Sequence, residues 1–153
     1  QKHSRIDLFG SGSGFKKADL ESKKYGLLDN VYIHGPVGKE IVDEAIKDAN
    51  ALIIIIPSET KYQVPGKLFE CLKMCKPVIA IMGECETATI LRRAGLGFIH
   101  APEDIEGLAN TLIDLWHDWR HGHASVEPDL EYIRQFSAEN LPEKLRPILT
   151  KLL

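Results

Sequence analysis

Short apolar runs alternate with stretches of helical period along the whole chain. The runs predict strands at 5–9, 31–34, 52–56, 77–82 and 97–100. The periodic stretches predict helices at 15–25, 40–49, 64–74 and 86–94, a long helix after Asp104, and further helix over 131–153, broken near Pro142 and Pro147. Strands that alternate with helices of this length form βαβ units around a parallel sheet. The sequence therefore predicts an α/β fold, a Rossmann-like doubly wound parallel sheet of at least five strands.

Three of these elements have patterns that predict more detail. The run 52–56 is continuously aliphatic and mostly β-branched, so we expect a strand covered on both faces at the centre of the sheet. Pro65 is expected at the first position of the helix 64–74, where its missing N–H costs nothing. Asp104 is placed to cap the long helix, whose apolar side chains form one stripe. The stripe consists of Ile105, Leu108, Ala109, Leu112, Leu115, Trp116 and Trp119.

Composition places the chain among ordinary globular domains. It has 153 residues, of which 44% are hydrophobic and 27% charged, and this excludes disordered, fibrous and disulfide-stapled classes. Its 19 Lys and Arg residues against 22 Asp and Glu residues give a net charge of −3. This charge does not indicate binding to nucleic acid or to an anionic membrane, both of which favour basic proteins. The longest apolar run, 51–56, is far shorter than the roughly 20 residues of a membrane-spanning helix. We therefore expect one water-soluble domain.

Two further features concern the origin of the chain. It begins at Gln1 with neither a methionine nor a leader-like stretch, so we expect it to be a piece of a longer protein. Cys71, Cys75 and Cys85 are odd in number and lack the spacing of a disulfide framework or a C-x-x-C motif. This pattern favours a reducing compartment and buried structural thiols.

Open parallel sheets bind ligands beyond the carboxyl ends of their strands. Five segments define that edge here: 10–14, 35–38, 57–66, 83–86 and 100–104. The first, Gly10-x-Gly12-x-Gly14, resembles a dinucleotide fingerprint, but Phe15 stands where the last glycine of G-x-G-x-x-G belongs. The second strand also ends at His34 and Gly35 instead of an acidic residue, which disfavours a nicotinamide cofactor. What remains is a tight turn whose amides, including that of Gly12, either face a ligand or only shape the turn.

The helix 64–74 gives a more specific signal. Lys67 and Glu70 share one face, while Leu68, Cys71, Leu72 and Cys75 form the opposite stripe. A carboxylate here can accept hydrogen bonds from the two hydroxyls of a ribose, and the free N–H groups near Pro65 and Gly66 suit a diphosphate. The alternative is an ordinary surface ion pair between Lys67 and Glu70.

Other candidates give weaker signals. His117, His121 and His123 have a metal-like spacing, but no carboxylate or thiol completes the set, so a solvated helix end is favoured and no metal site is predicted. Trp116 and Trp119 belong to the apolar stripe, with a surface for a membrane or a partner domain as the alternative.

A family resemblance follows from the residues 64–80. They read V-P-G-K-L-F-E-C-L-K-M-C-K-P-V-I-A and resemble the segment V-P-x-K-L-F-E-Y-L-A-x-G-K-P-V-I-A of retaining, nucleotide-sugar-dependent glycosyltransferases of the GT-B fold, the group 1 type. The segments 8–12, 28–37, 86–97 and 102–108 are similar to further segments of that family in the same order. The resemblance covers nearly the whole chain.

The resemblance implies that residues 1–153 are most of the C-terminal, donor-binding half of a GT-B enzyme. The N-terminal acceptor domain, and the strand and helix whose basic residues grip the diphosphate, would then lie before Gln1. Glu70 matches the glutamate that holds the ribose, and Lys67, with Gly66 and Pro65, would face the diphosphate. The loop of Gly35, Pro36 and Val37 matches the border of the nucleobase.

Departures from the family occur at two positions. Tyr62 stands where many members have a second glutamate near the donor sugar, so Tyr62 and Glu86 are the weaker candidates for sugar contacts. Cys75 stands where glycine is usual.

The activity that the resemblance implies is sugar transfer from a nucleoside-diphosphate sugar to a hydroxyl acceptor. It would proceed with retention and without a metal or other cofactor, in polysaccharide or glycolipid synthesis. Expected partners are the nucleotide sugar and a sugar or lipid-linked acceptor, with no nucleic acid. The location would be cytoplasmic, including the inner membrane face. No catalytic residue is expected on this chain, which should bind nucleotide weakly and transfer nothing by itself. The alternatives are a sugar-nucleotide epimerase of the same fold and a non-catalytic nucleotide-binding module.

Overall fold

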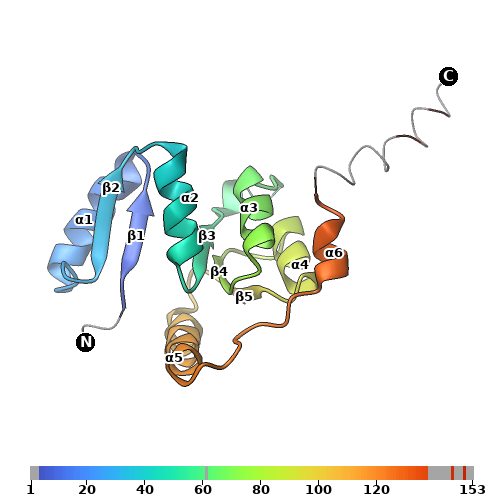
Figure 1. Cartoon of the computed structure of the whole chain (residues 1–153). Coiled ribbons are helices and arrows are strands. Elements are labelled where there is room, and N and C mark those ends of the chain that lie inside the picture. Colours follow the sequence, from blue (N-terminus) through green and yellow to red (C-terminus); the bar gives the residue numbers. More distant parts are fainter. Residues whose placement is uncertain (1–3, 61, 138–145, 147–149, 151–153) are drawn as a thin grey trace. The chain divides into compact units, whose positions relative to one another are not determined.

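All five predicted strands form, and they lie in two compact units. The computed structural model describes residues 4–60, 62–137, 146 and 150, with units at Gln1–Asp48 and Ala49–Leu153. The strands are β1 (Ile6–Phe9), β2 (Val31–Gly35), β3 (Leu52–Ile55), β4 (Val78–Ile81) and β5 (Gly97–His100). The helices are α1 (Ser13–Lys24), α2 (Lys39–Asp48), α3 (Gly66–Met74), α4 (Glu86–Arg93), α5 (Ile105–His121) and α6 (Leu130–Arg134), labelled in Figure 1. Every strand pairing is parallel, as predicted.

The first unit contains a two-stranded sheet. β1 and β2 pair in parallel with Ile6 opposite Val31 and Leu8 opposite Ile33, and α1 connects them. Because side chains alternate along a strand, Arg5, Asp7, Tyr32 and His34 lie on the other face from these aliphatic pairs.

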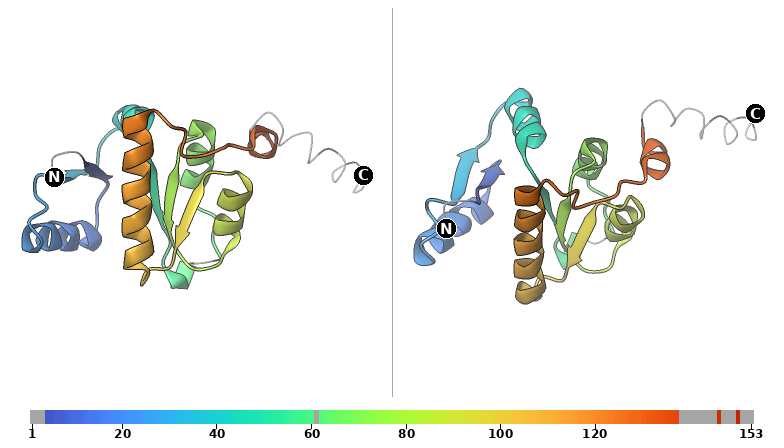
Figure 2. Two further views of the ribbon diagram at one scale, coloured as in Figure 1. Left: turned by 90° about the horizontal axis from the view of Figure 1, so that it is seen from below. Right: turned by 60° about the horizontal axis from the view of Figure 1, so that its bottom comes forward.

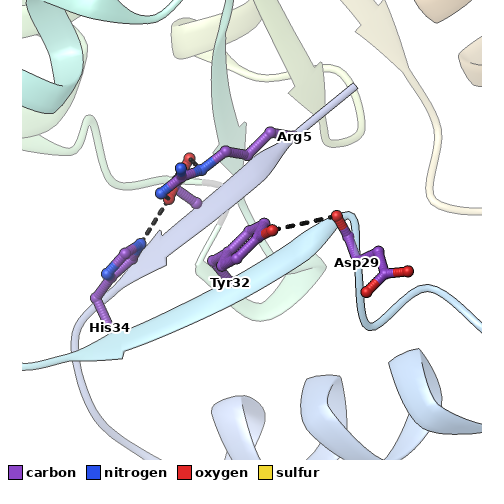
Figure 3. A network of polar contacts seen from close by, with 5 residues as sticks. Arg5, Asp29, Tyr32 and His34 are labelled. Atoms are coloured by element: carbon purple, nitrogen blue, oxygen red, sulfur yellow. Dashed lines mark hydrogen bonds and ion pairs between the residues drawn. The ribbon is translucent and has the colours of Figure 1, made fainter. Parts of the chain in front are cut away.

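A polar network covers that face of β1 and β2 (Figure 3). The Arg5 guanidinium donates two hydrogen bonds of 2.7 Å to the Asp7 carboxylate and lies 4.3 Å from the centre of the Tyr32 ring. His34 Nε2 lies 2.5 Å from the same carboxylate, and the Tyr32 hydroxyl donates to the Asp29 carbonyl at 3.3 Å. The hydrogen bonds from Arg5, more than those from His34, lower the pKa of Asp7 below its ordinary value.

The second unit contains a three-stranded sheet in the order β3-β4-β5. Figure 2 shows α5 on one face of this sheet and α3 and α4 on the other. The largest fully buried side chains belong to this unit, and they fill the layer between the sheet and its helices. They are Leu68, Leu72, Val78, Met82, Thr87, Leu91 and Leu96.

The expectation that 52–56 forms the covered centre of the sheet is wrong for this unit. The central strand is β4, whereas β3 pairs with β4 alone among the described strands. Leu52 and Ile54 are buried, but Ile53 and Ile55, on the opposite face, are 43% and 64% exposed. A continuous aliphatic run shows that a strand is hydrophobic but does not determine its place in the strand order.

The long helix also differs from its prediction. Asp104 caps it as expected, since its carboxylate accepts a hydrogen bond from the Gly107 amide. However, α5 has no buried residue, and Ile105, Leu112 and Trp119 are exposed. The predicted stripe therefore does not lie in the core, because a three-stranded sheet has a narrow face that covers only part of a seventeen-residue helix.

Element ends differ from the prediction by one or two residues. Pro65 is the N-cap of α3 and not its first helical residue, with an extended backbone (φ −69°, ψ 140°). Residues 58–60 of the predicted loop form a short 3-10 helix. Of the helix predicted over 131–153, the structure describes α6, and most residues after 137 lie outside the described part. None of the helices in the described part is both long and apolar enough to cross a bilayer.

Candidate functional site

Each of the five predicted ligand-facing segments follows a strand at its carboxyl end. In the first unit, the Gly10 amide donates to the Gly35 carbonyl at 2.8 Å and thereby joins the two loops after β1 and β2. Gly12, the N-cap of α1, has φ 133°, and Gly35 has φ 67°. A side chain would strain both positions, so the turn chemistry alone accounts for glycine there. Pro36 is exposed and Val37 is half-buried.

In the second unit, α3 is held against the sheet by a narrow stripe. Leu68, Cys71 and Leu72 are buried, whereas Lys67 and Glu70 are exposed on another side of the helix. This arrangement follows from the three- to four-residue spacing of the apolar positions and agrees with the predicted faces. The structure thus places the Glu70 side chain in the second turn of a helix that begins after the carboxyl end of β3.

The fold leaves the charged side chains of Lys67 and Glu70 exposed. Within the described part of the chain, no ion pair or hydrogen bond joins either side chain to another group. The interpretation of the two residues as a surface ion pair therefore receives no support. Both charges are available to a ligand.

The amino end of α3 is also open. No side chain caps it, and the Pro65 carbonyl accepts from the Leu68 amide at 2.9 Å. In contrast, α5 and α6 are capped by Asp104 and Asp129. The Gly66 and Lys67 amides at the positive end of the α3 dipole can therefore donate to an anion, and Gly66 leaves open space where a Cβ would be.

The two candidates for sugar contacts lie after neighbouring strands. Tyr62, 87% exposed, precedes α3, and Glu86 is the exposed first residue of α4. Cys85, the N-cap of α4, provides no side-chain hydrogen bond to the helix.

The sequence places His100 in one of the five predicted segments but assigns it no role. His100, the last residue of β5, approaches Asp104 Oδ2 through Nδ1 at 3.0 Å and Thr111 Oγ1 through Nε2 at 2.9 Å. The hydrogen bond with His100, followed by that from the Gly107 amide, lowers the pKa of Asp104. The histidine thus fixes the start of α5. The sequence contains a signal for this contact, because His100 ends a predicted strand and stands four residues before Asp104, the predicted cap of the long helix.

The remaining candidates are the three cysteines and the histidines at the end of α5. Cys71 is buried, and this raises the pKa of its thiol to about 11, as expected for a structural thiol. Cys75 and Cys85 are free thiols that are only half-buried. The rings of His117 and His121 stack 6.3 Å apart, and the described residues contain no group of three or more side chains placed to hold a metal ion.

A hollow of about 330 Å³ in the second unit lies elsewhere. Gly97, the first residue of β5, lines it together with Leu96 and Val126. It is therefore at the amino end of β5, away from the loops that carry the predicted site.

The fold and the carboxyl-end loops define a Rossmann-like α/β domain of the type found in GT-B glycosyltransferases. Residues 2–128 match the family model of the glycosyl transferases group 1, and the chain belongs to this family. The family resemblance and the fold class predicted from the sequence are thus confirmed.

Two relatives of the chain are longer proteins. An exopolysaccharide phosphotransferase of Streptomyces coelicolor is 26% identical over 148 residues, which are 97% of this chain and 15% of that protein. The structure of a sucrose-phosphate synthase from Thermosynechococcus elongatus has a TM-score of 0.74 at 20% identity and matches 97% of this chain and 38% of that chain. The chain therefore spans less than half the length of either protein.

Proposed function

We propose that the chain is the donor-binding part of a retaining glycosyltransferase and binds the nucleotide of a nucleoside-diphosphate sugar at the amino end of α3. The observation that carries the proposal is the exposed Glu70 carboxylate, which has no ion-pair partner in the described residues and belongs to a helix without a capping side chain. Membership of the glycosyl transferases group 1 supports it.

Each group at this end of α3 has a role in the proposal. The Glu70 carboxylate accepts hydrogen bonds from the two ribose hydroxyls, and bonds to a charged group contribute about 1.5–3 kcal/mol each. The Gly66 and Lys67 amides and the Lys67 ammonium face the diphosphate. Tyr62 and Glu86 lie nearest the sugar. The roles of Gly12, Gly35, Pro36 and Val37, which belong to the other unit, stay predictions.

The proposed reaction breaks the bond between the anomeric carbon and the diphosphate oxygen. The oxygen of an acceptor hydroxyl forms the new bond to that carbon with retained configuration, and the hydroxyl proton is transferred to the departing nucleoside diphosphate. The dipole of α3 and the Lys67 ammonium stabilise the negative charge on the departing nucleoside diphosphate, so no metal ion or cofactor is required. We place the acceptor in polysaccharide or glycolipid synthesis, in agreement with the name of the Streptomyces relative. Residues that act on the acceptor are not expected on this chain.

A nucleotide panel tests the proposal. UDP, GDP and ADP, and their sugar conjugates, are added to the wild-type chain, to Glu70→Ala and to Glu44→Ala, while binding is followed by saturation-transfer NMR. Glu44 is a matched control because it is an exposed helical glutamate in the other unit, on α2. We expect weak binding of one nucleotide class, at least tenfold weaker in Glu70→Ala and unchanged in Glu44→Ala.

Two results contradict the proposal. One is the absence of binding with every nucleotide, and the other is equal binding by wild type and Glu70→Ala. Epimerisation of the donor sugar in the absence of an acceptor would favour the epimerase alternative.

A further inference from the structure

A chain of ring contacts links α3 to two other helices of the second unit. Phe69 of α3 lies 5.7 Å from Phe136, centre to centre, and Phe136 meets the ring of Tyr132 edge-on at 5.3 Å. The Arg93 guanidinium at the end of α4 lies 4.4 Å from the centre of the Tyr132 ring. Tyr132 is 8% exposed, so α6 is docked through a buried aromatic side chain. Pairs of this kind contribute about 0.5–1.5 kcal/mol beyond burial.

The segment that carries Phe136 is fixed at its other end. The Asp129 amide donates to the Ala94 carbonyl at 3.0 Å, and Asp129 Oδ1 accepts from the Tyr132 amide at 2.8 Å. At Gly95 a Cβ would overlap the Glu127 carbonyl oxygen, so the segment crosses the end of α4 in direct backbone contact. Since α6 has five residues and cannot be stable alone, this docking holds Phe136 in place.

Phe136 contacts α3 outside the buried stripe of this helix. The buried stripe of the helix consists of Leu68, Cys71 and Leu72, and Phe69 lies beside this stripe, one residue before Glu70. Two supports at different angles around a helix fix its rotation about the axis. A rotation of about 20° would move a side-chain tip about 6 Å from the axis by about 2 Å. That displacement exceeds the tolerance of a hydrogen-bonded pair.

We propose that Phe136 is a positioning residue, which acts through Phe69 to hold the Glu70 carboxylate in the direction that a ribose requires. The inference rests on the proposed function, since it assigns an orienting contact to the same nucleotide site. Phe136 itself touches no part of the ligand. Loss of its ring leaves the buried stripe intact but frees the helix to rotate.

A set of coupled variants tests the inference. Binding of UDP, GDP and ADP to the 153-residue chain is measured by NMR titration for Phe136→Ala, Phe69→Ala, Glu70→Ala and the pairwise combinations. We expect Phe136→Ala to weaken binding of the nucleotide that wild type accepts about five- to tenfold. Phe69→Ala should weaken it equally, the double variant no further, and Phe136→Tyr should restore binding to within twofold because it keeps the ring.

The decisive comparison is made in the Glu70→Ala background. If Phe136 acts by orienting Glu70, adding Phe136→Ala there changes binding by less than twofold. An equal loss with and without Glu70 shows a general structural role and overturns the inference, as does unchanged binding by Phe136→Ala. Ile90→Val, a core change in α4, controls for reduced stability, and Phe136→Leu replaces Phe136→Ala if the latter does not fold.

The outcomes also separate the two proposals. Binding that Glu70→Ala abolishes but Phe136→Ala leaves intact overturns only the positioning role. No binding by wild type to any of the three nucleotides overturns the proposed function and, with it, the positioning role.

Discussion

Cys75 is the one described residue other than glycine with a positive φ. It ends α3 in the left-handed conformation, with φ 50° and ψ 34°, at the position where the family segment that residues 64–80 resemble has glycine. An L-residue pays about 1–2 kcal/mol for this conformation, and glycine avoids that cost but loses more chain entropy. The departure at Cys75 is therefore a local strain that the helix end tolerates.

We expect Cys75→Gly to raise the free energy of unfolding by up to about 1 kcal/mol. The matched variant Cys75→Ala keeps the strained L-conformation and loses the weak contact of Sγ with the Leu72 carbonyl, so it should not be stabilising. Urea unfolding followed by circular dichroism measures both. An equal gain from alanine and glycine would show that the sulfur, and not the backbone, causes the strain.

The sequence predicts the properties of a residue that depend on local spacing, but not those that depend on rotamers or on residues far away in the chain. The faces of α3 follow from residue spacing alone, which predicts the correct sides of the helix for Leu68 and Glu70. Whether Lys67 pairs with Glu70 does not follow from the sequence, because side-chain rotamers decide it and no residue pattern encodes them. Likewise, the ring chain from Phe69 to Tyr132 joins residues far apart in the sequence, and no local signal reveals it.

At the scale of elements, two glycines end helices in the same conformation but in different surroundings. Gly95 after α4 and Gly122 after α5 both have φ 69°. Gly122 has open space where a Cβ would be, whereas at Gly95 the Glu127 carbonyl oxygen occupies it. A side chain at Gly122 would therefore strain only the backbone conformation, whereas a side chain at Gly95 would also overlap the backbone of Glu127.

We expect Gly122→Ala to reduce the free energy of unfolding by about 1 kcal/mol and Gly95→Ala to reduce it by at least about 3 kcal/mol. The larger loss arises because the segment around Glu127 must move away from α4. Thermal and urea unfolding of the two variants measure the difference. Equal losses would contradict the close crossing at Gly95.

The network on β1 and β2 predicts a dependence of stability on pH. The folded state lowers the pKa of Asp7 below its ordinary value of 3.8, so its contribution is present above that value and is lost as the pH falls below it. The difference in unfolding free energy between wild type and Asp7→Asn should therefore shrink between about pH 5 and pH 3. Amide NMR signals of β1 and β2 during urea unfolding measure it.

Arg5→Gln provides the matched test, because the Arg5 hydrogen bonds are the main cause of the lowered pKa. In that background most of the pH-dependent difference should disappear. A difference between wild type and Asp7→Asn that stays constant down to pH 3 would contradict the assignment.

Element types were predictable because strand and helix periods are local, but the order of strands was not. The run 52–56 and β4 are both aliphatic, and the sequence favoured the wrong one as the centre. Only the strand pairing shows which strand is central: β4 pairs with β3 on one side and with β5 on the other. The same limit explains α5, whose amphipathic pattern did not reveal how narrow a sheet it would cover.

At the scale of the whole molecule, the chain leaves an aliphatic surface open on its second unit. Ile53 and Ile55 point to one face of β3, which is an edge strand among the described strands. The strand has no charged residue, proline or bulge to prevent pairing with another chain. Exposed hydrophobic edges of this kind promote self-association.

We therefore expect Ile55→Thr to reduce concentration-dependent self-association and binding of the dye ANS, while the free energy of unfolding changes by less than about 0.5 kcal/mol. Ile54→Thr is the matched control, because the same substitution on the same strand then faces the core, where Ile54 is 7% exposed. It should cost about 2 kcal/mol or more, through the lost methyl packing and a buried hydroxyl, and should not reduce association. Sedimentation velocity over a range of concentrations measures association. If Ile55→Thr associates as strongly as wild type, the open face of β3 is not the surface through which copies of this chain meet.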